Sequence, residues 1–245
     1  MPAISSTILS NASSELVFRG GGHEQPLVVR RLARARSMRL SVDPRDGTVR
    51  LSLPKRAALK PALEWVQGKR VWIEQALADV PAPRPVGDGA VIPFQGGDLT
   101  IFWQPGGSRT IKREAGRLLL GGAEESIEPR VLRWLKREAL ALLEAETRDC
   151  AIRAGVVVGR VGIGDPKARW GSCSASGDIR YSWRLILVPP EVLKATVAHE
   201  VAHRLHMDHS PRFHGAVAAL LGREPKAERR WLREHGAALY CFGRS

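Results

Sequence analysis

The feature that most constrains this chain is a pair of histidines four residues apart, His199 and His203, with Glu200 directly after the first. Side chains at positions i and i+4 of an α-helix lie on one face, so both imidazoles can reach one ion. Zinc binds histidine nitrogen at about 2.0–2.1 Å, and a glutamate beside such a pair can take a proton from water. This is the zincin pattern, and it predicts a zinc-dependent hydrolase, with a peptidase as the first candidate.

The surrounding residues favour a helix. Residues 191–207 contain neither Gly nor Pro, and Pro189-Pro190 stands where the first helical turn tolerates proline. Apolar side chains along the segment would bury most of its surface. Burying Glu200 together with histidines is costly unless something pairs with them. A metal ion is one such partner, and the alternative is a helix whose histidines are satisfied by carbonyls and carboxylates.

A catalytic zinc ion usually takes three protein ligands and one water, so a third ligand must come from outside the pair. His206 shares the helix face of the pair, but on a continuous helix it would lie about 10 Å along the axis from His199. One ion cannot span that distance. We therefore expect the helix to end near residues 205–208 and the chain to fold back.

The chain after this turn offers the preferred third ligand. Ser210 is suited to cap a new helix whose first residue is Pro211. His209 precedes that cap, six residues after His203, which is the interval that metzincins use. Metzincins have a positive-φ glycine where this chain has His206, and histidine tolerates that conformation better than most residues. The predicted site therefore has three zinc ligands, His199, His203 and His209, with Glu200 as the catalytic base.

Other third ligands stay open. Glu224 or Glu228, on a following helix, would complete a gluzincin-like site. His214 is a further histidine candidate, and it could also be a proton-transfer group or a surface residue.

Length and composition limit the class of protein. The 245 residues are enough for one large or two small domains, and no apolar run reaches the length of a membrane span. The first 22 residues lack the pattern of a secretory signal. The three cysteines, Cys150, Cys173 and Cys241, show no paired spacing and indicate reduced thiols. We therefore expect a cytoplasmic protein with no membrane partner.

The net charge of +13 raises the question of nucleic-acid binding. The densest basic cluster consists of Arg30, Arg31, Arg34, Arg36 and Arg39. Such a cluster can bind a polyanion, or it can be a solvated strand edge whose charge discourages edge pairing. A nucleic-acid-associated protein, in which the basic N-terminal region delivers the protease to its target, is the second functional hypothesis.

The coarse pattern of elements predicts an α+β fold. Polar and apolar residues alternate over 38–42 and 49–53, which predicts a hairpin around the turn 43–47. Residues 57–77 are expected to form a helix with Trp65 and Trp72 in the core. Short strands follow near residues 90–93, 99–103, 110–112 and 117–120. Beyond them we expect a helix over 126–155, strands over 156–163 and 179–188, and helices over 191–207, 211–221 and 225–239.

This pattern suggests three regions. Residues 1–25 are expected to be disordered, residues 26–122 to form a small β-rich region with one helix, and residues 123–245 to form the metallopeptidase domain.

Several motifs together resemble the YgjP-like metallopeptidase family, which is related to SprT-like and WLM zinc-protease domains. The motifs are Arg169-Trp170-Gly171-Ser172-Cys173, His199-Glu200-Val201-Ala202-His203 and His209-Ser210-Pro211-Arg212-Phe213, with weaker matches upstream from Arg36. The resemblance implies a bacterial cytoplasmic protein with a minimal zincin-like domain. It also implies the same three zinc ligands and the same base. The family commonly has Trp where this chain has His214, which implies a more polar rim.

The expected reaction is hydrolysis of a peptide bond by water activated by zinc and Glu200. An exposed edge of the strand 179–188 could hold an extended peptide or protein substrate. Oxyanion stabilisation has four candidates, Arg169, Tyr181, Arg184 and His214. A third hypothesis, metal-dependent nucleoside triphosphate pyrophosphatase activity, ranks last because phosphate chemistry usually uses carboxylate-held Mg²⁺.

Overall fold

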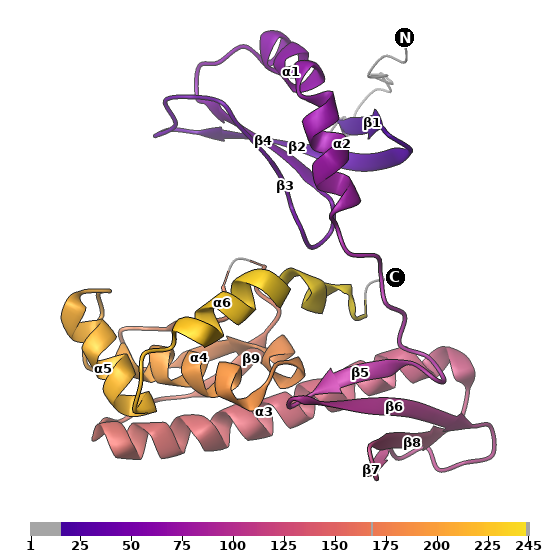
Figure 1. Ribbon diagram of the computed structural model, residues 1–245, viewed down its shortest axis with the longest axis vertical. Helices are drawn as coiled ribbons and strands as arrows, with labels where there is room; N and C mark the ends of the chain where they lie inside the picture. Colours follow the sequence, from indigo (N-terminus) through magenta and orange to yellow (C-terminus); the bar gives the residue numbers. More distant parts are fainter. Residues whose placement is uncertain (1–15, 168, 244–245) are drawn as a thin grey trace. The chain divides into compact units, whose positions relative to one another are not determined.

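The computed structural model describes residues 16–167 and 169–243 (Figure 1). Helices and small sheets are mixed along the chain, so the α+β prediction is confirmed. The chain forms two compact units that divide between Ala82 and Pro83. No helix in the described ranges is both long and apolar enough to cross a membrane.

The first unit is a four-stranded sheet packed against two helices. Its strands have the order β1-β2-β4-β3, with β2 and β4 parallel and the other pairs antiparallel. Alternate residues of β4, Val49, Leu51 and Leu53, are fully buried, as a period of two requires. The elements are β1 (Val17–Gly20), β2 (His23–Leu32), β3 (Arg39–Val42), β4 (Val49–Pro54), α1 (Leu59–Gly68) and α2 (Arg70–Ala78).

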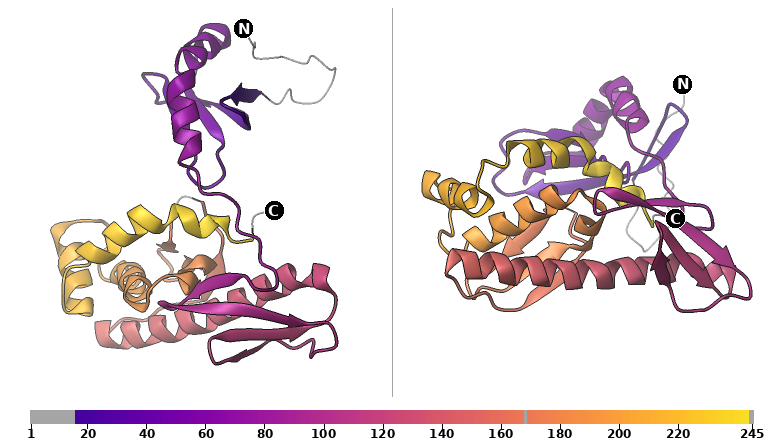
Figure 2. Two further views of the ribbon diagram at one scale, coloured as in Figure 1. Left: turned by 45° about the vertical axis from the view of Figure 1, so that its right-hand side comes forward. Right: turned by 60° about the horizontal axis from the view of Figure 1, so that its bottom comes forward.

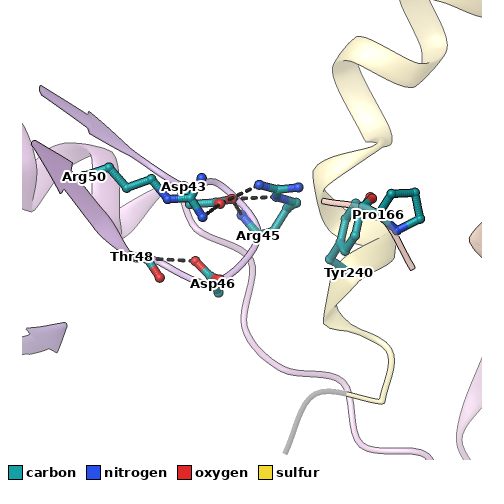
Figure 3. Close-up of polar contacts among 7 residues, drawn as sticks. All are labelled: Asp43, Arg45, Asp46, Thr48, Arg50, Pro166 and Tyr240. Atoms are coloured by element: carbon teal, nitrogen blue, oxygen red, sulfur yellow. Dashed lines mark hydrogen bonds and ion pairs between the residues drawn. The ribbon is translucent and has the colours of Figure 1, made fainter. Parts of the chain in front are cut away.

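The predicted β3–β4 hairpin is confirmed, and a buried carboxylate fixes its turn. Asp43 is 3% exposed and accepts hydrogen bonds from Arg45 Nε at 2.6 Å and Nη2 at 2.5 Å. Arg50 Nη2 lies 2.5 Å from the same carboxylate (Figure 3). Two cations thus compensate the burial of one anion, and Gly47 supplies the positive φ of 73° that the turn needs.

Two expectations for the first unit need correction or qualification. The helix expected over 57–77 is two helices, separated at Lys69, whose ψ of 13° departs from helical geometry. In α2, Ile73 and Leu77 face the core, and the adjacent Trp72 is 45% exposed. The prediction that Trp72 is a core residue is therefore wrong. Of the stretch expected to be disordered, residues 1–15 lie outside the described residues, and Val17–Gly20 is strand β1.

The second unit begins with another four-stranded sheet, of order β5-β6-β8-β7. Its buried side chains, such as Ile92 and Ile101, belong to one hydrophobic cluster with Val131 and Leu135 of the long helix α3. Both views in Figure 2 show this sheet beside α3. This shared core explains why the division lies at residue 82, whereas the sequence suggested 122. The elements are β5 (Val91–Phe94), β6 (Gly97–Gln104), β7 (Lys112–Glu114), β8 (Arg117–Gly121) and α3 (Ile127–Ala154), preceded by the short 3-10 turn η1 (Glu124–Ser126).

A three-stranded sheet follows, of order β10-β11-β9, made of β9 (Val161–Gly164), β10 (Gly171–Cys173) and β11 (Ile179–Ser182). Both long strands expected here are shorter than predicted. The Ser182 hydroxyl accepts a hydrogen bond from Arg184 N at 3.3 Å and starts the 3-10 helix η2 (Trp183–Leu187). Since η2 is fully buried, its apolar run could not be distinguished from a strand by periodicity.

The order of this sheet corrects the substrate-edge expectation. Strand β11 lies between β10 and β9, pairing antiparallel with β10 and parallel with β9. The segment 179–188 therefore offers no free edge. The edge strands are β10 and β9, and β10 packs beside helix α4.

Three helices complete the unit, α4 (Pro190–Ala202), α5 (Pro211–Leu221) and α6 (Lys226–His235), followed by the 3-10 helix η3 (Ala237–Cys241) (Figure 1). Helix α4 is buried on most sides, with Val192, Val197 and Val201 each at most 3% exposed. A buried helix holds its side chains rigidly, which suits a helix that presents polar groups at fixed positions.

Candidate metal centre

The imidazoles of His199, His203 and His209 converge on one point. Their potential ligand atoms all lie within 4.8 Å of one another, and His209 Nε2 lies 3.3 Å from His199 Nε2. Four ligands around zinc at about 2.0–2.1 Å in a tetrahedron are about 3.3–3.4 Å apart. The His199–His209 separation therefore fits a shared zinc ion.

A tight turn after α4 brings His209 back to the pair. The helix ends at Ala202, and Leu205 N and His206 N both donate to Ala202 O, at 3.0 and 2.9 Å. This end is earlier than the expected 205–208. Among the described non-glycine residues, only Gln95 and Ala115 have positive φ, so the expected left-handed conformation at His206 is wrong. The chain reverses direction through the two hydrogen bonds to Ala202 O, and His206 needs no left-handed conformation.

Two further contacts orient the imidazoles. His203 Nδ1 lies 3.2 Å from His206 O, which makes Nδ1 the protonated nitrogen and leaves the Nε2 lone pair for a metal. Ser210 Oγ accepts a hydrogen bond from Phe213 N at 3.4 Å, so the predicted N-cap of α5 is confirmed. This cap fixes the chain directly after His209.

Phe213 forms an apolar backing for the cluster. Its ring is fully buried, and its centroid lies 4.5 Å from that of His203, 4.8 Å from His209 and 4.9 Å from His199. Sequence reasoning assigned Phe213 no role. Its position two residues inside a capped helix that follows His209 was the available signal.

Burial favours the neutral form of His199 and His203. The pKa of His199 is lowered to about 4, chiefly by burial, with smaller contributions in the same direction from the neighbouring His203 and His209. Burial also lowers the pKa of His203. A neutral imidazole has the free lone pair that a metal ion requires.

Glu200 is 5% exposed, and burial raises its pKa to about 7, while the positive charge of Arg169 acts in the opposite direction. The carboxyl group lies against the backbone of β10. A methyl group built on Gly171 would be 2.5 Å from Glu200 Oε1 and 2.7 Å from its Cγ. Only glycine permits this approach. Glycine inside a strand often marks such a contact, a signal that sequence reasoning left unused.

The segment that leads into β10 is tied to the C-terminal residues. Arg184, 6% exposed, binds both carboxylate oxygens of Asp165, from Nε at 2.8 Å and from Nη2 at 3.0 Å. Its Nη1 donates to Leu239 O at 2.6 Å. Tyr240 Oη donates to Pro166 O at 2.7 Å (Figure 3). These contacts fix Asp165 and Pro166 before β10, while Gly171 itself is placed by its pairing with Tyr181 of β11.

The structure separates the four oxyanion candidates. Arg184 is occupied by Asp165, and Tyr181 is fully buried with its hydroxyl 3.0 Å from Thr147 Oγ1. Arg169 is exposed, and its positive charge acts to lower the pKa of Glu200. His214 is also exposed, with Nδ1 3.4 Å from Arg229 Nη2. Only Arg169 and His214 remain as candidates.

The alternative third ligands have other partners. Glu224 is exposed and lies 2.7 Å from Lys226 Nζ, and the buried Glu228 pairs with Arg223. Within the described ranges, the candidate metal-binding cluster that includes His199 and His203 is completed by His209 and contains no glutamate.

A cavity of about 230 Å³ adjoins the cluster between α4, α6 and the start of β10. Its lining includes His199 and Glu200 together with apolar and charged side chains from three helices. A small molecule or a peptide side chain in this cavity would touch the predicted base.

The family description "YgjP-like, metallopeptidase domain" matches residues 36–235. The match includes part of each unit and all the residues of the candidate centre. No curated protein and no solved structure was found to match the chain.

Proposed function

Because the chain belongs to the YgjP-like metallopeptidase family, we propose that it is a zinc-dependent peptidase with His199, His203 and His209 as ligands and Glu200 as general base. The observation that carries the proposal is the convergence of the three imidazoles, with two nitrogens at the spacing of zinc ligands. Peptides or proteins are the substrates that a metallopeptidase domain implies.

The donor set supports zinc over the common hard cations. Neutral imidazole nitrogens suit zinc, whereas Mg²⁺ and Ca²⁺ prefer carboxylate and carbonyl oxygens. Zinc bound here would polarise the substrate carbonyl and lower the pKa of a coordinated water. The same donor set gives no support to the pyrophosphatase hypothesis, and no contact described here favours the nucleic-acid hypothesis.

Glu200 has the environment of a general base. Burial raises the pKa of Glu200 in the metal-free protein to about 7, which makes its carboxylate a stronger proton acceptor than an exposed glutamate. Glu200 would take the proton of the attacking water and transfer it to the leaving amine. Gly171 and the bonded segment before it hold the carboxyl group in place for both transfers.

The edge of β10 supports binding of an extended peptide. In the described part of the sheet, β10 pairs with β11 on one side only. A substrate strand could pair with the other edge through its backbone, and at Gly171 it would pass beside Glu200. Arg169, directly before this edge, is the favoured group for stabilising the oxyanion.

The test is Glu200→Gln with unfolded casein as substrate. The variant should keep the zinc content of the wild type, because the imidazoles are unchanged, and should lose hydrolysis by a factor of about 100 or more. Glu144→Gln, the same change at an exposed carboxylate of α3 outside the cavity, controls for nonspecific effects. Hydrolysis by Glu200→Gln at the wild-type rate would remove Glu200 from its role.

A further inference from the structure

The cavity beside Glu200 has walls suited to a long aliphatic chain. Helix α4 contributes Ala195, α5 contributes Val217, and α6 contributes Leu232. Trp170 and Pro225 add further apolar surface. Since His199 and Glu200 also line the cavity, its occupant would be a side chain close to the bond that is cleaved.

A buried carboxylate interrupts these apolar walls. Glu228 lines the cavity and is 4% exposed. Its Oε1 bonds to Arg223, and this hydrogen bond is the main reason that its pKa lies below the usual range. Glu228 is therefore ionised at neutral pH.

The second oxygen of this carboxylate accepts no hydrogen bond from the described protein atoms. This oxygen, Glu228 Oε2, is also buried. A buried charged oxygen with no hydrogen-bond donor is much less stable than an exposed one, which water solvates. A ligand that brings a donor to Oε2 would recover this free energy on binding.

Two arginines also line the cavity, and they favour a different ligand. Arg169 and Arg229 are exposed, and Arg229 Nη2 lies 3.4 Å from His214 Nδ1. Exposed charges are screened by water and salt, whereas a buried charge is not. An acidic ligand side chain would also bring a second carboxylate toward Glu228. The buried group therefore has the stronger influence on selectivity.

We propose that this cavity is a substrate side-chain pocket in which Glu228 selects lysine or arginine next to the cleaved bond. The aliphatic part of the side chain would lie against Val217 and Leu232, and the cationic end would donate to Glu228 Oε2. The inference rests on the proposed peptidase function.

The experiment measures kcat/KM of the zinc-loaded enzyme for three matched peptides. The peptides differ only in the residue beside the cleaved bond, and this residue is lysine, norleucine or glutamate. Each residue is tested on either side of the bond. Wild type should cleave the lysine peptide with kcat/KM at least about tenfold above the norleucine peptide, as expected for a charge-assisted hydrogen bond. In Glu228→Gln this ratio should fall toward one.

Two other variants complete the test. Glu224→Gln changes an exposed carboxylate next to the same helix and should leave the ratio unchanged. Arg223→Gln removes the hydrogen bond that keeps Glu228 ionised and should lower the ratio, which keeps the proposal testable if Glu228→Gln fails to fold.

The outcomes separate the two proposals. Cleavage of casein with the same lysine-to-norleucine ratio in wild type and Glu228→Gln would overturn the pocket assignment and leave the peptidase intact. A preference for the glutamate peptide would also overturn it and assign selectivity to the arginines. Zinc-loaded wild type that cleaves neither casein nor any peptide would contradict the peptidase proposal itself, and the pocket assignment with it.

Discussion

At the scale of single residues, the candidate site depends on groups held in unfavourable electrostatic environments. Burial keeps His199 neutral and raises the pKa of Glu200 to about 7. Both pKa shifts show that burial disfavours the charged form of the side chain. His199 would bind the metal ion, and Glu200 would transfer the proton. The metal-free protein should therefore show the cost of this arrangement in its stability.

We predict that Glu200→Gln stabilises the metal-free protein at alkaline pH. The carboxyl has a pKa of about 7 when folded against an ordinary 4.5, so the folded state binds more protons between these values. Its stabilising contribution is thus present below pH 4.5 and is lost as the pH rises through 7. The variant should gain about 3 kcal/mol over wild type near pH 8, and less than about 1 kcal/mol near pH 5.

The measurement is urea unfolding of both proteins with a chelator present. The opposite pH dependence of His199 occurs in both proteins and cancels in the difference. If the two proteins differ in their free energy of unfolding by the same amount near pH 5 and near pH 8, the pKa assigned to Glu200 is contradicted.

Gly171→Ala should separate metal binding from hydrolysis. The added methyl would lie 2.5 Å from Glu200 Oε1 and must displace the carboxyl group. Since a displacement of about 1 Å can lower the rate about 100-fold, kcat/KM should fall by about 10- to 100-fold with zinc content unchanged. Gly162→Ala is the control, because a methyl there meets nothing within 4 Å. Equal activity of the two variants would rule out a positioning role for Gly171.

At the scale of elements, the site is made by a helix, a reversal and a second helix. Helix α4 supplies His199 and Glu200, the turn after Ala202 carries His203 and His209, and α5 begins at Pro211. The cap at Ser210 links the position of His209 to the stability of α5. A change at the cap should therefore be transmitted to the metal site.

Ser210→Ala should lower both stability and zinc affinity. Loss of an N-cap hydroxyl costs about 1 kcal/mol, and the freed turn would hold His209 less firmly. Chelator competition should show zinc binding about threefold to tenfold weaker. Ser52→Ala, in strand β4 of the first unit, serves as the control. Unchanged zinc affinity in Ser210→Ala would show that the cap does not hold His209.

The sequence predicted those elements whose ends are encoded locally. Ser210 and Pro211 marked the start of α5, and Gly155, with φ of 66°, ends α3. Strand pairing is not local, so the sequence could not show that β10 is the edge beside Glu200. It also could not distinguish the buried 3-10 helix over Trp183–Leu187 from a continuing strand. The roles of Gly171, Phe213 and Glu228 depend on such long-range contacts.

At the scale of the whole molecule, the two units have separate hydrophobic clusters. The first is built on Leu51, Leu53 and Ile73, and the second on residues from Val86 onward. All residues of the candidate centre lie in the second unit. The metal site should therefore not require the core of the first unit.

A fragment of residues 83–245 should fold and bind zinc as the full chain does. Its own cluster supplies the buried surface, and all three imidazoles are present. Circular dichroism and elemental analysis of the purified fragment provide the check. A folded fragment without zinc would show that the first unit contributes to the metal site.

The most direct test of the central claim is the zinc content of the purified full chain, measured by elemental analysis beside His209→Ala and Glu224→Ala. The converging imidazoles predict one zinc per chain in wild type and in Glu224→Ala, and a large loss in His209→Ala. Wild type without stoichiometric zinc, or His209→Ala with a full complement, would contradict the assignment of the metal centre.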